Sequence, residues 1–374
     1  MSARWFHRCA LTVAALLPAG RADARQYSRE GGQLYLAGEA RSLTFDRSSG
    51  LGRLRQFTVP VGLVAPLGRF TVDLGTAWAS TQLLRTDGTS HTVSHVTDTQ
   101  ARGSYVFGRD AVVATVMLNV PTGPKDASPR DYTVIGAVSP SLLGFPVASY
   151  ANGLSVTGGV AGAIEAGDWS LGLAGSLRVS SRFTPYVDAA GPIEYKPGLE
   201  GRIRGGADGL IGASRLSLGV TYSTFGEDQF GVSGGSPGRG LYRPGPRWLF
   251  EAGLTAPLGN NTLGVYAWNF HRAAGDTTGT SAGNRENLLV GEVSLSVPVL
   301  AWLAIEPMAM GRVSTPESGH GAIGGVGASL RFRLSDAVSI TPTARYDVGS
   351  LTESNHAKTS IHGGYLSAFV RASF

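Results

Sequence analysis

Apolar and polar residues alternate along most of the chain with a period of two. In residues 337–348, for example, Val338 and Ile340 fall on one side and Ser339 and Thr341 on the other. The same alternation occurs in segments 168–180, 247–257 and 288–299. Since successive residues of a strand point to opposite faces, each segment predicts a β-strand with one apolar face and one polar or small face. A length of about 10 residues suits a tilted strand that crosses a membrane, because strands of soluble proteins are commonly shorter.

Short and long connections alternate between the predicted strands. Short turns are expected at 66–68, 108–110, 167–168, 213–214, 259–261, 301 and 335–336. Long connections rich in Gly, Pro, Asp, Ser and Thr are expected at 81–97, 121–152, 182–197, 227–245, 273–286, 314–320 and 350–360. These turns delimit 14 strands, and a further strand ends at Phe374. Bacterial single-chain barrels have an even number of strands, so parity assigns another strand to 33–46.

The strand pattern predicts an all-β fold, a transmembrane antiparallel up-and-down β-barrel of about 16 strands. The alternative is about 14 strands, if two weak segments are not strands. The composition agrees, because 53 of 374 residues are Gly and only 16% are charged. Such a chain is too poor in charge for a disordered protein and too rich in Gly for an ordinary helical one.

The N-terminus has the three parts of a secretory signal peptide. Arg4, His7 and Arg8 form a basic start, residues 9–17 are largely apolar, and residues 22–24 (Ala-Asp-Ala) form a cleavage site of the A-x-A type. We therefore expect a signal peptide over residues 1–24, cleaved after Ala24. Residues 25–374 are then a single barrel domain.

Removal of the signal peptide changes the charge and the cysteine content. Three Arg and one Asp leave with it, so the formal net charge falls from +5 to +3. Such a small excess does not indicate a nucleic-acid partner. The only cysteine, Cys9, leaves as well, so we expect no disulfide, no Cys-ligated metal and no thiol nucleophile. The sequence indicates no cofactor.

The last ten residues, 365–374, alternate and end in an aromatic residue, Phe374. This segment resembles the C-terminal strand of bacterial outer-membrane barrels. The resemblance implies export to the outer membrane, recognition of the strand ending in Phe374 by the barrel assembly machinery, and contact with outer-membrane lipids and lipopolysaccharide.

A second resemblance lies in one predicted hairpin. Residues 97–108 (TDTQARGSYVFG) are followed by 116–123 (VMLNVPTG), with Pro124 intervening before Lys125. The hairpin resembles a motif of the phenol meta-pathway transporter family, distant relatives of the FadL-like barrels that admit hydrophobic compounds. Segments 195–198 and 218–225 also resemble this group. The resemblance implies a passive channel, and it carries over no binding residues.

Charged residues in strand centres are expected to face the interior, because a charge that faces lipid costs about 2–4 kcal/mol at the midplane. Such charges either set solute selectivity or form structural Arg–carboxylate ladders, and the second reading is slightly favoured. Besides Asp73, the residues predicted to line the pore are Arg178, Arg202, Arg204, Glu251, Glu292, Glu306, Arg331, Arg333, Arg345 and Asp347.

Aromatic residues near the predicted strand ends are expected to form girdles at headgroup level. They are Trp78, Trp169, Trp248, Trp268, Trp302, Tyr222, Tyr346 and Tyr365. Tyr105 and Phe107 are placed at the same level.

Three patterns suggest other chemistry, and each has a simpler reading. His91 and His95 have a spacing that binds metal on a helix, but they lie in a predicted Thr/Ser-rich loop, so no metal site is expected. Residues 231–235 match G-x-S-x-G around Ser233, without the strand and helix that a nucleophile elbow needs. His271 and Asp276 are the kind of pair an omptin-like protease uses, but a loop carboxylate is expected there anyway.

The sequence thus predicts an outer-membrane channel for passive uptake of small molecules, with hydrophobic or aromatic ones as candidates, and not an enzyme. The alternatives are a structural or surface-interaction barrel with a plugged lumen and, less favoured, a barrel lipase or protease. In the channel reading, the long connection 121–152 selects the solute and the charged inner wall guides it.

Overall fold

The computed structural model describes residues 31–46, 50–108, 112–125, 127–188, 191–232, 242–277, 280–281, 285–315, 319–353 and 358–374. The predicted signal peptide with Cys9 lies outside these residues, as does Ser233 of the G-x-S-x-G match. The expectations for them therefore remain predictions.

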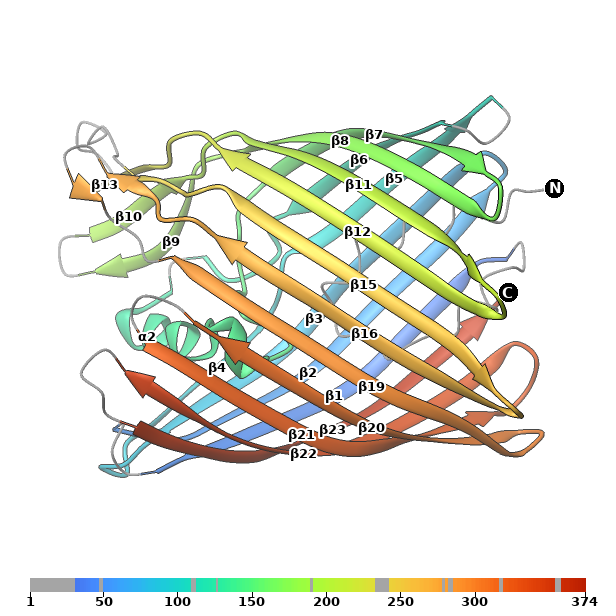
Figure 1. Ribbon diagram of the computed structural model, residues 1–374. Coiled ribbons are helices and arrows are strands. Elements are labelled where there is room, and N and C mark those ends of the chain that lie inside the picture. Colours follow the sequence, from blue (N-terminus) through green and yellow to red (C-terminus); the bar gives the residue numbers. More distant parts are fainter. Residues whose placement is uncertain are drawn as a thin grey trace.

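One closed antiparallel sheet forms the wall (Figure 1). Each strand pairs with its neighbours along the chain, and β1 pairs with both β2 and β23, which closes the ring. Its strands are β1 (Gln33–Phe45), β2 (Leu51–Leu67), β3 (Phe70–Arg85), β4 (Ser90–Val96), β5 (Thr99–Phe107), β6 (Val112–Val120), β7 (Ser155–Ala166), β8 (Trp169–Ser180), β11 (Glu200–Ile211), β12 (Ser214–Phe225), β15 (Arg247–Leu258), β16 (Asn261–Arg272), β19 (Glu286–Leu300), β20 (Leu303–Ser314), β21 (Gly319–Arg333), β22 (Val338–Glu353) and β23 (Lys358–Ser373).

The fourth wall strand is broken into β4 and β5, which both pair with β3. Trp78 lies opposite Val96, and Gly75 lies opposite Gln100. The sheet has 17 strand segments, and β4 and β5 share one position in the ring. The barrel therefore has 16 strands, which confirms the predicted fold and count. The alternative of 14 strands is wrong.

The two ends of the barrel differ. The short turns lie at one end, with residues 31 and 374, and we call this the short-turn end (Figure 1). The long connections lie at the other, the long-loop end. Two small sheets form there: one contains β9 (Phe183–Asp188), β10 (Gly191–Lys196) and β13 (Gln229–Val232), and the other β14 (Tyr242–Arg243), β17 (Asp276–Thr277) and β18 (Thr280–Ser281).

One predicted long loop, 81–97, is wrong. Strand β3 continues to Arg85, a turn over 86–89 reverses the chain, and β4 returns along β3. The turn is stabilised by Asp87, whose carboxylate accepts hydrogen bonds from the backbone N–H and the hydroxyl of Thr89 at 2.8 and 2.6 Å. Short polar side chains that bond the backbone two residues ahead favour such turns. Because β4 is rich in Ser, Thr and His, its sequence resembled a polar loop and the strand was not predicted.

Large apolar side chains cover the outer face of the wall. Leu173, Val160 and Val326 are exposed there, as are Trp78 and Trp248 of the predicted girdles. Two girdle assignments are wrong. Trp268 lies opposite Glu251 on the inner face and packs against the buried core. Tyr365 also faces inward, and its hydroxyl donates to Glu39 at 2.9 Å. A period of two separates the faces of a strand but does not say which face is inside.

Residues 121–125 and 127–154, here called the insert, fold back inside the barrel from the long-loop end (Figure 1). The insert contains α2 (Pro129–Val138) and the 3-10 turn η3 (Ser141–Leu143). Ser128 begins the helix with a capping box, in which its hydroxyl accepts from the Asp131 N–H and the Asp131 carboxylate accepts from the Ser128 N–H. Among the described residues, no helix is long and apolar enough to cross a bilayer.

Candidate functional site: the barrel lumen

The insert packs against one side of the lumen. Val134, Val138, Leu143 and Tyr150 are almost fully buried. The described hydrophobic cluster around them draws its wall residues from β1 to β4, β16, β19 and β21 to β23, and includes none from β5 to β15. Burial of this apolar surface is the main favourable contribution to docking.

Asp98, at the break between β4 and β5, ties both ends of the insert to the wall. Its carboxylate accepts hydrogen bonds from the Gly123 N–H at 3.0 Å, the Asn152 N–H at 2.6 Å and the Asn119 amide at 2.9 Å. Its own N–H donates to the Tyr150 carbonyl at 3.2 Å. The wall strand breaks where this donor turns away from the β-ladder towards the insert.

A second group of polar contacts holds the middle of the insert. The Gln56 amide donates to the Val147 carbonyl at 2.7 Å and accepts from the Val147 N–H at 2.9 Å. The Tyr150 hydroxyl lies 2.5 Å from the Thr81 hydroxyl. Gln56 and Thr81 are buried on the inner face, so these contacts give β2 and β3 a fixed register with the insert.

The third anchor is ionic. The Arg41 guanidinium on β1 donates to the Leu143 carbonyl at 2.8 Å and pairs with Asp347 on β22 at 2.8 Å. Asp347 also pairs with Arg345 at 2.7 Å. The side chains of Arg41 and Asp347 are 0% and 1% exposed. A buried pair of this kind contributes mainly geometry, because desolvation offsets much of the attraction.

The start of α2 is attached to β4. His91, which faces the lumen from β4, places its Nε2 2.6 Å from the Asp131 carboxylate. Burial acts to raise the pKa of Asp131, but the hydrogen bonds from Ser128 and His91 outweigh it, and the pKa lies below its ordinary value. The carboxylate of Asp131 therefore favours its charged form while the insert is docked.

The structure places the residues predicted to line the pore on the inner face. Residues directly opposite across a strand pair share a face, and this register links all of them to the side that carries the insert. Most of them pair with one another or with an inner-face neighbour. The ion pairs are Arg102–Asp73, Arg178–Glu200, Arg202–Glu200, Arg204–Glu251, Arg331–Glu306 and Arg345–Asp347.

Glu292 and Arg333 complete the predicted set. Glu292 faces inward opposite Tyr266 and Met310. Arg333 is exposed near the short-turn end of β21, opposite Ser339. The role of the whole set as a selective lining remains a prediction, because pairing by itself is equally what a structural ladder needs.

Exposure divides the inner-face charges into two groups. Arg178 and Arg202, on β8 and β11, keep side-chain exposures of 33% and 40%. Arg41 and Asp347, beneath the insert, are sealed. Beside these exposed charges, the inner faces of β7 and β8 carry small residues such as Gly159 and Ala174. The lumen is therefore filled on one side and lined by accessible charge on the other.

An aromatic strip on β16 was missed by sequence reasoning. Tyr266, Trp268 and Phe270 lie on the inner face, between the ion-paired wall and the insert. The Tyr266 hydroxyl donates to Glu251 at 3.3 Å. The spacing of two between these residues showed that they share one face of the strand. Because aromatic residues near strand ends also form girdles on the outer face, the sequence did not place this strip inside.

The described residues form no metal site and no catalytic group from the His91/His95 or His271/Asp276 pairs. His91 and His95 lie on a strand and not in a loop, which corrects that expectation. His91 bonds Asp131, and His95 lies beside Tyr150. In this part of the chain no group of His, Cys, Asp and Glu could hold a metal ion. His271 faces outward from β16, whereas Asp276 lies in β17 opposite Arg243.

Comparison with known proteins gives distant structural likenesses. No protein-family model matches the sequence, and no curated protein matches it at a significant level. A solved structure described as the CymD monoaromatic hydrocarbon channel is 10% identical, with a TM-score of 0.43 over 94% of this chain and 90% of that one. A bacterial polysaccharide outer membrane secretin is 9% identical, with a TM-score of 0.45 over 92% and 98%. An anion-selective porin from Comamonas acidovorans is 11% identical, with a TM-score of 0.41 over 92% and 99%. Likenesses at this distance do not identify a shared activity.

Proposed function

We propose that this protein is an outer-membrane channel that lets small molecules cross passively between the insert and the exposed wall of the lumen. The observation that carries the proposal is the uneven filling of the lumen. Arg178 and Arg202 remain exposed on one side, while Arg41 and Asp347 are sealed on the other. A fully plugged barrel would seal both groups.

The outer face supports a membrane location. Leu173, Val160 and Val326 are more than half exposed, and exposed apolar surface on this scale marks contact with lipid or protein. Barrels of this class have short periplasmic turns and longer extracellular loops. We accordingly assign the short-turn end to the periplasm and the long-loop end, with the mouth of the insert, to the outside.

The lining supports small solutes that combine an aromatic or apolar part with a polar group. Tyr266, Trp268 and Phe270 offer ring faces along β16, and the neighbouring ion pair of Arg204 with Glu251 offers hydrogen bonds. Solute sites with mostly apolar walls and a few polar groups are common in channels and binding proteins.

Planar-bilayer conductance of the refolded full chain tests the proposal, together with uptake of a phenol-sized aromatic solute and of a sugar of similar mass into proteoliposomes. We expect discrete conductance steps and faster uptake of the aromatic solute. A Trp268→Ala variant is expected to narrow that preference, and Trp169→Ala, on the outer face, is the matched control. A folded barrel with neither conductance nor uptake would overturn the channel.

The second candidate is a barrel whose lumen is permanently closed and whose loops bind a partner. The dense attachment of the insert through Asp98, Gln56 and Arg41 favours it. The same bilayer experiment decides between the two, because a closed barrel gives no conductance.

A further inference from the structure

A polar and aromatic row crosses the outer face of the wall near the long-loop end. Tyr222 lies opposite Trp248, Trp248 opposite His271, and His271 opposite Asn287. All four therefore share one face, and it is the outer one, because Glu251 and Trp268 on the same two strands have the opposite parity and face the lumen. Rings with one apolar and one polar end are typical of the headgroup level of a bilayer.

Asn269 lies on the same face, next to this row on its short-turn side. Its amide donates to the Asn287 side-chain oxygen at 2.8 Å and to the Leu288 carbonyl at 3.3 Å. The Asn287 amide reaches the Thr315 hydroxyl at 3.4 Å. Among the described residues, the His271 ring and the Asn269 side-chain oxygen have no hydrogen-bond partner. At the headgroup level such groups are available to hydrogen-bond the polar part of a bound amphiphile.

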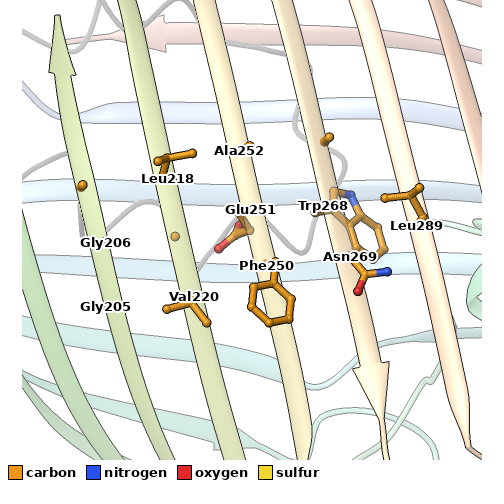
Figure 2. A pocket seen from close by; sticks show the side chains of 13 residues that line it. Gly205, Gly206, Leu218, Val220, Phe250, Glu251, Ala252, Trp268, Asn269 and Leu289 are labelled. Carbon is orange, nitrogen blue, oxygen red and sulfur yellow. The ribbon is translucent and has the colours of Figure 1, made fainter.

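Next to the polar row is an apolar hollow of about 490 Å³. Val220, Phe250 and Leu289 lie around it, and Ala252 and Ala267 form its low floor. Figure 2 shows Leu218, Val220 and Phe250 on adjacent strands about this hollow. A second hollow, which shares Phe250 and Asn269 with the first, extends it to Trp248, His271 and Asn287. The two hollows therefore form one groove that is apolar below and polar above.

This order of chemistry matches an amphiphile with its chain in the hollow and its headgroup at the row. The polar part contains two amides, an imidazole and an indole, and the phenol of Tyr222 lies beside the indole. No Lys or Arg lines either hollow, and the side chain of Glu251, which also borders the first hollow, is on the inner face of β15. Amide and imidazole groups suit hydroxyl and carbonyl partners, whereas a site built for phosphate alone favours Arg and Lys. The aromatic rings of Trp248 and Tyr222 lie 4.6 Å apart between centroids and offer flat apolar faces beside these polar groups.

We propose that this groove binds one molecule of an acylated saccharide, the lipopolysaccharide of the outer leaflet, with one acyl chain on the Ala252–Ala267 floor and sugar hydroxyls at His271, Asn269 and Asn287. The site rests on the proposed membrane location, because only there does this face meet the outer leaflet. It is independent of whether the lumen conducts.

Native mass spectrometry of the full refolded barrel tests the site. The probes are a rough-type lipopolysaccharide and a phospholipid with acyl chains of matched length. We expect the wild type to retain one lipopolysaccharide in preference to the phospholipid. The Asn269→Leu/Asn287→Leu double variant, which is better suited to lipid contact, is expected to lower the apparent affinity about tenfold.

Three further variants make the test specific. Ala267→Leu fills the floor of the hollow and is expected to weaken retention to a similar degree. Ala114→Leu on the outer face of β6 and Gln82→Leu on the outer face of β3 are the matched controls and are expected to retain the wild-type affinity. Heat-modifiable electrophoretic mobility verifies that every variant is a folded barrel.

Three outcomes would overturn the proposal. They are equal retention of the phospholipid, unchanged binding in both the amide and the floor variants, and a change of oligomeric state in these variants without a change in lipid binding, which would assign the groove to a second copy of the chain. Bilayer conductance measured on the same preparations separates failure of this site from failure of the channel, since the groove variants leave the lumen untouched.

Discussion

The carboxylate of Asp98 joins residues from both ends of the insert at one point on the wall. Its partners, the N–H groups of Gly123 and Asn152, are separated in sequence by α2 and η3. Gly123 is required there, because a Cβ atom would lie 2.3 Å from the Tyr150 carbonyl oxygen. One side chain thus closes the insert into a loop with a fixed base.

Replacement of Asp98 is predicted to release the insert. Asp98→Ala leaves the N–H groups of Gly123 and Asn152 and the Asn119 amide without their acceptor, and each such loss costs about 1–3 kcal/mol. We expect the docking free energy to fall by about 3 kcal/mol in total and cleavage within 127–149 by an added protease to accelerate. Asp87→Ala, at an exposed turn, is the matched control. Unchanged protection in Asp98→Ala would show that apolar packing alone holds the insert.

At the residue scale, the sequence predicted which charges share the inner face but not what they bond. Arg204 and Glu251 are far apart in sequence, and their pairing depends on the register of three strands. In the sequence, Asp98 resembles any polar residue near a strand end. Its role becomes visible only in the folded chain, where the backbone N–H of Asn152 lies next to its carboxylate. Contacts of this kind depend on tertiary structure, which local patterns do not contain.

The helix α2 is the element that connects the insert to β4. Its start is fixed twice, by the capping box at Ser128 and by the contact between His91 and Asp131. The apolar residues of the segment 134–147 were the signal that this connection packs inside, since a solvated loop has no need of them. Their short runs lacked a clear period, so the sequence alone did not predict a helix.

The attachment of α2 is predicted to depend on pH through Asp131. Its pKa is lowered in the docked state, so its contribution is present above the ordinary carboxyl pKa and is lost as the pH falls through the lowered value. We expect protection of the insert to be constant from about pH 8 to about pH 5 and to decline below about pH 4. Proteolysis with an acid-active protease, or conductance, measures this.

Asp131→Asn is the matched variant for the pH prediction. It removes the titrating group and weakens the capping box, so we expect a less protected insert at neutral pH, by about 1 kcal/mol, together with loss of the decline in acid. An acid profile identical to that of the wild type would assign the titration to another group.

For the molecule as a whole, the strand count was predictable because it depends on local signals. Most of the short turns carry a Gly with positive φ, as at Gly167 and Gly259, and each short turn marks a hairpin. The break between β4 and β5 was not predictable, because it results from competition between the insert and the β-ladder for the Asp98 N–H. The same holds for the uneven filling of the lumen.

Removal of the insert is predicted to widen the passage. Residues 123 and 150 touch at the Asp98 hub, so residues 127–149 can be replaced by a short Gly-Ser linker without strain on β6 or β7. We expect a folded barrel with a conductance several times that of the wild type. A same-length replacement of the insert by a Gly-Ser segment is the control for loop length. Equal conductance of the wild type and the deletion variant would place the constriction elsewhere.

The seam between β1 and β23 gives the assembly of this protein an order in time. The ionic anchor of the insert joins Arg41 on β1 to Asp347 on β22, and β23 lies between them. Before β1 pairs with β23, Arg41 and Asp347 lie near opposite ends of an open sheet and cannot form their ion pair. The insert precedes β7 to β23 in the chain, but its ionic anchor can form only after the ring has closed. The lumen is therefore widest when the ring closes, and full docking of the insert narrows it afterwards.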